Sequence, residues 1–226
     1  MNKIVVATDS VLLSVINDEL CVLLMKRNKD PFKHMFSLPG GVVNSSESLD
    51  DAVQRILVEK IKINNIPYLE QLYTFGSLDR ESADRSRSIS VSYMALVNSE
   101  KIETSINYHT NEILWLPVSN LPKLAFDHNQ IIEKAIERLQ NKARYSKVGF
   151  SLVKSEFTVP ELRVVFEAII GKKLNPTNFR TKLLKMKILE PVKNKKMIKG
   201  RGQPAPIYKL NIKKLELMKN TEQLFN

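Results

Sequence analysis

The sequence predicts an α/β fold in which helices flank a mixed β-sheet, followed by a smaller domain of helices and a basic β-hairpin. In the first part, several short segments alternate apolar and polar residues and one amphipathic helical segment interrupts them, which is typical of a sheet covered by helices. Residues 1–149 contain 18 basic and 18 acidic residues, whereas residues 150–226 contain 17 and 6, so the net charge of +11 lies wholly in the last third. We therefore predict two domains, at residues 1–149 and 150–226.

Composition restricts the location and the metal chemistry of the protein. Of its 226 residues, 43% are hydrophobic, which is enough for a core, but no apolar run is long enough to cross a bilayer. The first residues lack the features of a signal peptide, and the single cysteine, Cys21, is expected to be a buried thiol. We therefore expect a cytoplasmic protein with no membrane partner. The three histidines are scattered along the chain and indicate no transition-metal site.

The first domain contains the pattern of a hairpin, three further strands and a long helix. Residues 5–15 and 20–25, separated by the turn signal Asn17-Asp18, predict the hairpin. Strands are also expected at residues 68–77, 88–96 and 111–116. Apolar residues at helical spacing then predict a helix at residues 129–147, with Asp127 as its cap and His128 at its entry.

A glycine loop leading into an amphipathic helix is the most informative stretch of this domain. It spans residues 40–63, GGVVNSSESLDDAVQRILVEKIKI, and Ser45 or Ser46 is expected to cap the helix. The apolar positions recur at helical spacing, and the polar face carries Glu47, Arg55 and Glu59.

This stretch resembles the Nudix box, G-x5-E-x7-R-E-U-x-E-E-x-G-U, where U is aliphatic. The resemblance implies an α/β/α sandwich in which the glutamates of the box hold Mg²⁺ against a diphosphate and a coordinated water attacks phosphorus. The matching positions are Gly41, Glu47, Arg55, Leu57, Glu59 and Ile63.

Two of the three carboxylates that would hold the metal are missing from this box. Ile56 and Lys60 stand where glutamates are expected, and Lys62 replaces the late glycine. Because an ammonium repels Mg²⁺ and one glutamate anchors it poorly, we expect a domain that binds its ligand without hydrolysis, with no catalytic residue, metal or cofactor. The alternative is a working Mg²⁺-dependent pyrophosphatase of ADP-ribose or nucleoside-diphosphate sugars, which borrows carboxylates from Asp79, Glu81 or Asp84.

Eight residues are predicted to bind the ligand. Lys26 and Arg27 could pair with a diphosphate, or they could be solvated cations at the end of a strand. Arg80 and Arg87 flank a charged loop and could reach phosphate or ribose, or they could pair with aspartates of that loop. Glu47 and Arg55 could instead hold the glycine loop onto the helix, which is the role we expect for Arg55. The predicted set is Lys26, Arg27, Gly40, Gly41, Glu47, Glu59, Arg80 and Arg87.

The basic last third has the pattern of two helices and a hairpin. After a short extended segment at 150–153, the capping box Thr158-Val159-Pro160-Glu161 begins a helix that Gly171 ends. Asn175-Pro176 begins a second helix, which buries Phe179, Leu183 and Met186. Residues 189–192 and 205–210 form the hairpin around a loop at 193–204, and residues 215–224 predict a terminal helix.

This order is that of a winged helix, in which the second helix enters the major groove of DNA and the hairpin touches its flank. Lysine and arginine would contact phosphates, while Asn178, Arg180 and Thr181 could read base edges. The alternatives are a dimerisation or protein-interaction module with a solvated basic face, and an RNA-binding protein. The predicted DNA-binding residues are Thr177, Asn178, Arg180, Thr181, Lys182, Lys185, Lys199, Arg201 and Gln203.

Over nearly its whole length the chain resembles the NrtR family of Nudix-related transcriptional regulators of NAD metabolism. The resemblance is carried by the loop PGGVVN, by FDHNQ followed by AIERLQNKARYS, by EFTVPEL and by GRGQPAPIYKL. It implies a homodimeric repressor on double-stranded, palindromic operator DNA, from which ADP-ribose or a related NAD metabolite releases it. Some relatives sense a sugar instead, so a sugar remains an alternative effector.

Overall fold

The computed structural model describes residues 4–63, 66–78, 80, 86–98, 113–197 and 205–217, without the side chains of 193–197. The chain divides into two compact units, one of Met1–Ile16 and Leu20–Arg138 and one of Asn17–Glu19 and Leu139–Asn226. The predicted boundary after residue 149 stays a prediction. Six predicted functional residues lie outside the described part of the chain: Asp79, Glu81, Asp84, Lys199, Arg201 and Gln203. None of the described helices is long and apolar enough to cross a membrane.

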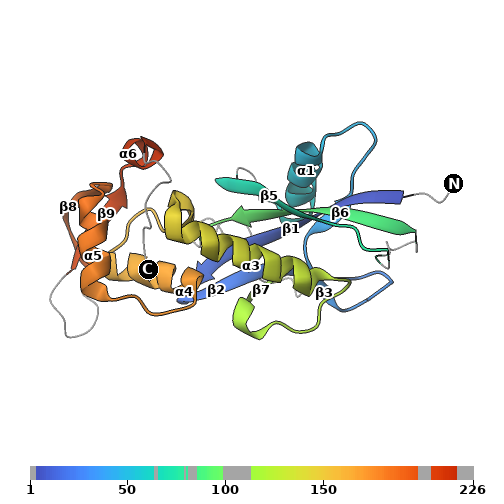
Figure 1. Ribbon diagram of the computed structural model, residues 1–226, viewed down its shortest axis with the longest axis horizontal. Coiled ribbons are helices and arrows are strands. Elements are labelled where there is room, and N and C mark those ends of the chain that lie inside the picture. The colour runs from blue at the N-terminus through green and yellow to red at the C-terminus, as the bar shows by residue number, and fades with distance from the viewer. Residues whose placement is uncertain are drawn as a thin grey trace. The chain divides into compact units, whose positions relative to one another are not determined.

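The first unit is built on a mixed seven-stranded sheet with β1 (Ile4–Ile16) at its centre (Figure 1). β1 pairs in parallel with β6 (Arg87–Leu96) and antiparallel with β4 (Gly40–Val42). It also adjoins β2 (Glu19–Lys26) through the predicted turn, where Asn17 and Asp18 have φ of 49° and 67°, as a two-residue hairpin turn requires. The strand content predicted from the alternating pattern is thus confirmed.

The other strands extend the sheet on both sides. β5 (Tyr68–Phe75) pairs antiparallel with β6, while β7 (Ile113–Pro117) and β3 (Phe36–Ser37) pair antiparallel with β2. The sequence did not indicate β3 and β4, because segments of two and three residues are too short to display an alternating pattern.

Helix α1 (Leu49–Ile61) is the predicted amphipathic helix and covers one face of the sheet. Its buried residues Val53, Leu57 and Ile61 pack against Leu12 and Val91, among other residues of the strands. The predicted cap was wrong. Ser48 caps the helix instead of Ser45 or Ser46, because Asp51 lies three residues after it and completes a reciprocal capping box.

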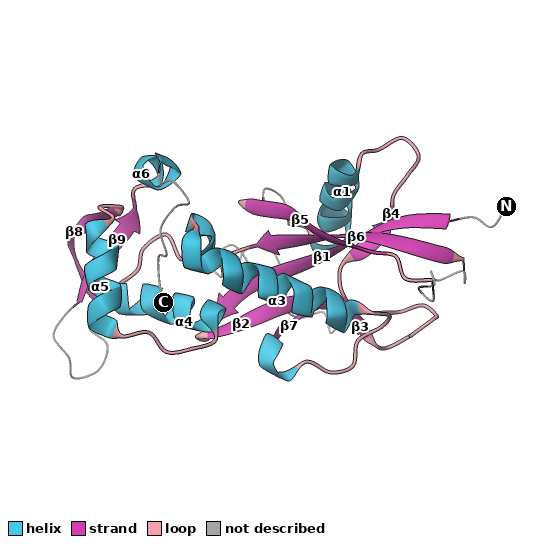
Figure 2. Cartoon of the chain, viewed as in Figure 1, coloured by secondary structure: helices cyan, strands magenta, loops and turns pink. Residues whose placement is uncertain are grey.

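The opposite face of the sheet carries the start of α3 (His128–Tyr145). Side chains alternate along a strand, so Asp9 of β1, which faces His128, points away from the α1 side on which Leu12 lies. The predicted α/β/α arrangement is therefore confirmed (Figure 2). Asp127 directly precedes the helix, where its backbone carbonyl accepts a hydrogen bond from Ile131 and its carboxylate binds Arg80; its role as the cap stays a prediction. A short 3-10 helix, Val118–Asn120, lies between β7 and α3.

The second unit contains helices α4 (Val159–Ile170) and α5 (Pro176–Lys185) and the hairpin of β8 (Leu189–Met197) and β9 (Ala205–Leu210). The predicted capping box of Thr158 and Glu161 is confirmed, as are the end of α4 at Gly171 with φ of 75° and the cap of α5 by Asn175. These local signals mark the ends of the two helices, and the hairpin follows them in the order expected for a winged helix.

Two predictions for the second unit were wrong in detail. Within the segment at 150–153, residues 150–152 belong to a 3-10 helix, Lys147–Leu152, and only Val153 is extended, because Ser146 caps the helix and Gly149 packs closely on Phe166. The last described helix, α6 (Ile212–Leu217), begins three residues before the predicted start at 215. Asn211 explains the difference, since its side chain accepts a hydrogen bond from the backbone of Lys214.

A buried carboxylate connects α4 to the turn that follows it. The Glu167 side chain of α4 is only 5% exposed and accepts hydrogen bonds from Arg163, Lys173 and the backbone N–H of Leu174, at 2.6, 3.1 and 3.0 Å. Burial acts to raise the pKa of Glu167, but the Leu174 N–H, Lys173 and Arg163 together lower it below its ordinary value of 4.5. The turn between α4 and α5 therefore depends on an ionised Glu167.

We predict that Glu167→Gln lowers the free energy of unfolding by about 1–2 kcal/mol at neutral pH, because it removes the negative charge that Arg163 and Lys173 contact. Since the pKa of Glu167 is depressed in the folded state, this difference should shrink as the pH falls through that pKa. Urea unfolding followed by circular dichroism measures it. The exposed Glu216→Gln in the same unit should change stability by less than about 0.5 kcal/mol, and equal effects of both variants would contradict the assignment.

Candidate ligand cavity and DNA-binding face

The first unit contains a cavity of about 530 Å³ beside the glycine loop, between the ends of β1, β2 and β4 and the start of α3. This volume lies in the range of ordinary small-molecule sites. The lining residues are Val5, Ala7, Asp9, Met25, Lys26, Arg27, Asn28, Lys29, Ser37, Leu38, Gly40, Gly41, Val42, Lys60, Arg80, Ser88, Phe126 and His128.

The cavity carries a strong excess of positive charge. Five of its lining residues are cations, and the only carboxylate among its described lining residues is Asp9. Because Asp9 is already bound by Arg80 and Ser90, the remaining cations attract an anionic ligand, and lysine and arginine donate well to phosphate oxygens. The remaining cations are Lys26, Arg27, Lys29 and Lys60.

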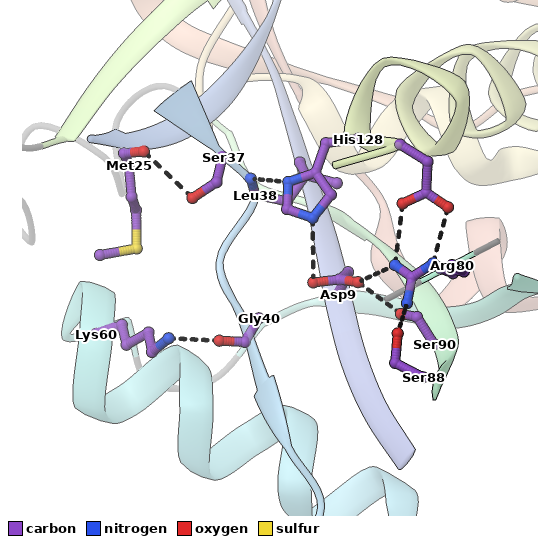
Figure 3. Close-up of polar contacts among 11 residues, drawn as sticks. Asp9, Met25, Ser37, Leu38, Gly40, Lys60, Arg80, Ser88, Ser90 and His128 are labelled. Carbon is purple, nitrogen blue, oxygen red and sulfur yellow. Dashed lines mark hydrogen bonds and ion pairs between the residues drawn. The ribbon is translucent and has the colours of Figure 1, made fainter. Parts of the chain in front are cut away.

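A buried ion-pair network forms the floor of the cavity (Figure 3). Arg80 donates to both carboxylate oxygens of Asp127 at 2.8 and 3.0 Å, to Asp9 at 3.2 Å and to the Ser88 hydroxyl at 3.1 Å. The Ser90 hydroxyl donates to Asp9 at 2.6 Å. Burial opposes the charge of Arg80, but Asp127 and Asp9 raise its pKa overall. The network thus joins β1, β6 and the start of α3.

His128 and Gly40 complete this floor. The backbone N–H of Leu38 donates to Nδ1 of His128 at 2.9 Å, and Nε2 lies 3.6 Å from Asp9. Burial lowers the pKa of His128, so a neutral ring with its proton on Nε2 fits both neighbours. Gly40 is required here because a Cβ at this position would lie 2.0 Å from the Asp9 carboxylate and 2.8 Å from the Thr8 carbonyl oxygen.

The two unusual box residues occupy different environments. Ile56 is buried, and its Cδ1 lies 3.1 Å from where a Cβ on Gly41 would be, so it packs directly beneath the glycine loop. Lys60 reaches the cavity, where its ammonium donates a hydrogen bond to the Gly40 carbonyl (Figure 3). Partial burial of the ammonium lowers the pKa of Lys60.

Glu47 and Arg55 hold the glycine loop against α1. Arg55 donates to both oxygens of Glu47 at 2.8 and 2.6 Å and to the Val42 carbonyl at 3.1 Å. The Arg55 guanidinium lowers the pKa of Glu47 to about 2, and the Asn44 N–H contributes to this shift. Glu59, the one box carboxylate left at the metal positions, lies 3.3 Å from the same Arg55. This geometry matches the structural role expected for Arg55.

A magnesium site of the Nudix type does not fit the side chains present. Ile56 has no donor, Lys60 brings a positive charge, and Glu59 is paired with Arg55. Within the described ranges, no group of three or more histidine, cysteine, aspartate or glutamate residues could hold a metal ion. A divalent cation prefers several hard oxygen ligands, which this box does not offer.

The cavity brings together five of the eight predicted ligand-binding residues: Lys26, Arg27, Gly40, Gly41 and Arg80. Glu47 and Glu59 lie outside its lining, and Arg87 is exposed on β6, 3.5 Å from the Gly76 carbonyl. Their part in ligand binding stays a prediction. The sequence did not single out Asp9, Lys29 or Phe126 as pocket residues, and it assigned His128 only to the entry of a helix.

An aromatic group bounds one side of the cavity. The Phe126 ring lies 4.9 Å from the Phe32 ring and 5.5 Å from the His128 ring, measured between centroids. The Arg27 guanidinium lies 4.8 Å above Phe126 and donates to the Pro31 carbonyl at 2.9 Å, so both contacts fix its position. The cavity therefore offers a flat apolar surface next to its cations.

The exposed face of α5 carries the predicted DNA-binding residues of that helix. Phe179 and Leu183 are buried in the core of the second unit, which orients the helix with its polar side toward solvent. All six predicted residues of α5 are exposed: Thr177, Asn178, Arg180, Thr181, Lys182 and Lys185. The three predicted residues of the hairpin loop lie outside the described part of the chain.

Comparison with known families matches both units. A model of the NUDIX domain matches residues 7–139, and a model of the NrtR DNA-binding winged helix domain matches residues 149–210. The chain is 33% identical over 205 residues to the ADPR responsive transcriptional repressor NtrR of Acinetobacter baylyi, covering 89% of this chain and 80% of that protein. It is also 34% identical over 120 residues to an ADP-ribose pyrophosphatase of Methanocaldococcus jannaschii, covering 53% of this chain and 68% of that enzyme.

Solved structures of NrtR from Shewanella oneidensis agree with this result. The structure in complex with a 27mer DNA has 35% sequence identity and a TM-score of 0.79, covering 93% of this chain and 95% of that one. The NUDIX domain of the same protein in complex with ADP ribose has 35% identity and a TM-score of 0.53, covering 62% of this chain and 90% of that one. The chain therefore belongs to the NrtR family, with a NUDIX domain followed by a DNA-binding winged helix domain.

Proposed function

We propose that this protein is a transcriptional repressor that binds operator DNA through its winged helix domain and responds to ADP-ribose bound in its NUDIX cavity. The observation that carries the proposal is the combination of a cation-lined cavity in one unit with an exposed, basic α5 in the other. Two relatives support it: the Acinetobacter protein is an ADPR responsive transcriptional repressor, and Shewanella NrtR has been solved in complex with DNA and its NUDIX domain in complex with ADP ribose. The regulated genes are expected to be those of NAD metabolism.

The DNA side of the proposal uses α5 as the recognition helix. Its exposed lysines and Arg180 would pair with phosphates, and Asn178 and Thr181 offer groups that can read base edges in the major groove. The hairpin of β8 and β9 would contact the flanking backbone. The expected contacts of Lys199, Arg201 and Gln203 stay predictions, because these residues lie outside the described part of the chain. The protein would act as a homodimer, because a palindromic operator presents two equivalent half-sites.

The ligand side of the proposal uses the cavity as a sensor and not as a catalytic site. The diphosphate of ADP-ribose would lie among the cations, and Phe126 offers a flat surface for a ring of the ligand. Ile56 and Lys60 support binding without hydrolysis, because neither can hold the metal that Nudix chemistry requires.

The two sites would communicate by linkage. If ADP-ribose binds one arrangement of the dimer more tightly, it shifts the population toward that arrangement. DNA requires recognition helices about 34–36 Å apart, so an arrangement with another spacing binds the operator less well. ADP-ribose would therefore release the repressor from DNA.

We predict that Arg180→Ala weakens operator binding by about 10- to 100-fold, the range expected for a groove-facing arginine. Fluorescence anisotropy of the full chain on duplex DNA from upstream of its own gene, at fixed salt, measures this change. Lys134→Ala serves as the matched control, since it removes an equal charge from the exposed surface of α3. If both variants lose the same affinity, α5 is not the recognition helix. Equal binding to duplex RNA would favour an RNA-binding protein instead.

We predict that ADP-ribose lowers the affinity for operator DNA and that operator DNA lowers the affinity for ADP-ribose by the same factor, as linkage requires. Titrating ADP-ribose into the protein–DNA complex measures the first effect, and calorimetry with and without DNA measures the second. Independent binding of the two partners would contradict the proposed regulation. Release by a sugar but not by ADP-ribose would keep the repressor and change its effector.

An ADP-ribose pyrophosphatase is the second candidate function, because the Methanocaldococcus enzyme is similar over the NUDIX part of the chain. We predict no turnover of ADP-ribose by the native chain in the presence of Mg²⁺. The double variant Ile56→Glu/Lys60→Glu restores two carboxylates of the box, and a gain of Mg²⁺-dependent hydrolysis in it would support the proposal. Strong Mg²⁺-dependent formation of AMP by the native chain would establish the enzyme instead.

A further inference from the structure

We propose that the Lys60 ammonium takes the place of a divalent cation in the NUDIX cavity, so that protein cations bind the diphosphate of the ligand directly and without Mg²⁺. This inference rests on the proposed function, since it concerns the same cavity. It adds the chemical basis on which the cavity recognises a diphosphate after the metal site of the Nudix box has been lost.

The position of Lys60 is fixed where a box carboxylate would stand. It lies in the last turn of α1, and its ammonium donates a hydrogen bond to the Gly40 carbonyl of the glycine loop (Figure 3). An ammonium has three N–H donors, so two remain for oxygen atoms of a ligand. Among the described residues, no carboxylate forms an ion pair with Lys60, so its charge is available to an anion.

The charges around Lys60 favour an anion over a metal ion. Partial burial lowers the pKa of Lys60, Asp9 partly offsets this effect, and Arg27 adds to it by repulsion. Asp9 is engaged by Arg80 and Ser90 and cannot serve as a strong metal ligand. A diphosphate between Lys60 and Arg27 would relieve their repulsion, whereas a divalent cation would increase it.

Among the described residues, the neighbouring box positions argue against a metal ion that acts together with the lysine. Ile56 packs under Gly41 and has no oxygen to offer, and Glu59 lies against Arg55 with its side chain 58% exposed. The cations of this cavity are lysine and arginine side chains, whereas a metal ion would have to be bound from solution. Binding of the diphosphate therefore requires no second component from solution.

The experiment is calorimetric titration of ADP-ribose into the full chain, once in EDTA and once in excess Mg²⁺. The expected dissociation constants agree within about twofold, because no metal takes part in binding. Lys60→Met should weaken binding by about 10- to 100-fold in both buffers, the loss expected for a charge-assisted contact with a phosphate. Lys60→Arg should retain most of the affinity.

Two controls distinguish a direct contact of the Lys60 charge with the ligand phosphate from a role of Lys60 in the structure of the cavity. Lys62→Met removes an equal charge at the end of the same helix, outside the cavity lining, and should change the affinity by less than about twofold. Adenosine has no phosphate, so its weaker binding should be the same for the native chain and Lys60→Met. A loss of adenosine binding in Lys60→Met would mean that Lys60 only maintains the structure of the cavity, which would overturn the inference.

The metal comparison uses the native chain alone, so it decides the question even if Lys60→Met folds poorly. Binding of ADP-ribose only in Mg²⁺ would overturn the inference and leave the proposed function intact. Lack of ADP-ribose binding in both buffers would instead overturn ADP-ribose as the effector. Native affinity in Lys60→Met would show that other cations hold the diphosphate, and this outcome also contradicts the proposal.

Discussion

The ion pairs of Arg80 with Asp9 and Asp127 are the interaction on which the first unit depends. Arg80 and Asp9 have side chains only 9% and 10% exposed, so their charges persist in the interior only because each satisfies the other. Removal of one partner from such a pair costs about 3–5 kcal/mol. The network joins the central strand to the start of α3, and it requires glycine at position 40, where the Asp9 carboxylate leaves no room for a side chain.

Two matching residues of the Nudix box, Glu47 and Arg55, have a structural role in this chain. Glu47 and Arg55 occupy their expected positions in the box and bind each other. Arg55, on α1, also donates to the Val42 carbonyl, so the pair holds the glycine loop against the helix. The loop needs this support whether or not a metal is bound. Two of the three metal positions differ from the Nudix pattern: Ile56 is an apolar residue that fills the core, and Lys60 is a lysine that reaches the cavity.

Most of the fold could be predicted from the sequence because its strands, caps and helix stripes are local patterns. The capping box of Thr158 and the turn at Asn17-Asp18 are examples. Part of the site was predicted: Gly40 and Gly41 from the motif, and Lys26, Arg27 and Arg80 from their charge and their position along the chain. Asp9 and Arg80 are 71 residues apart in the sequence, and no local pattern indicates that a buried pair will form between them. The sequence showed that Lys60 stands where a metal-binding glutamate is expected, but the contact of its ammonium with the Gly40 carbonyl depends on tertiary packing.

Helix α3 begins at the floor of the cavity, where His128 accepts a hydrogen bond from Leu38, and continues without a break to Tyr145. Its 18 residues span about 27 Å, and an α-helix of this length is stiff. Residues 139–145 of this helix belong to the second unit, so α3 carries the chain from the cavity floor into that unit without an intervening loop.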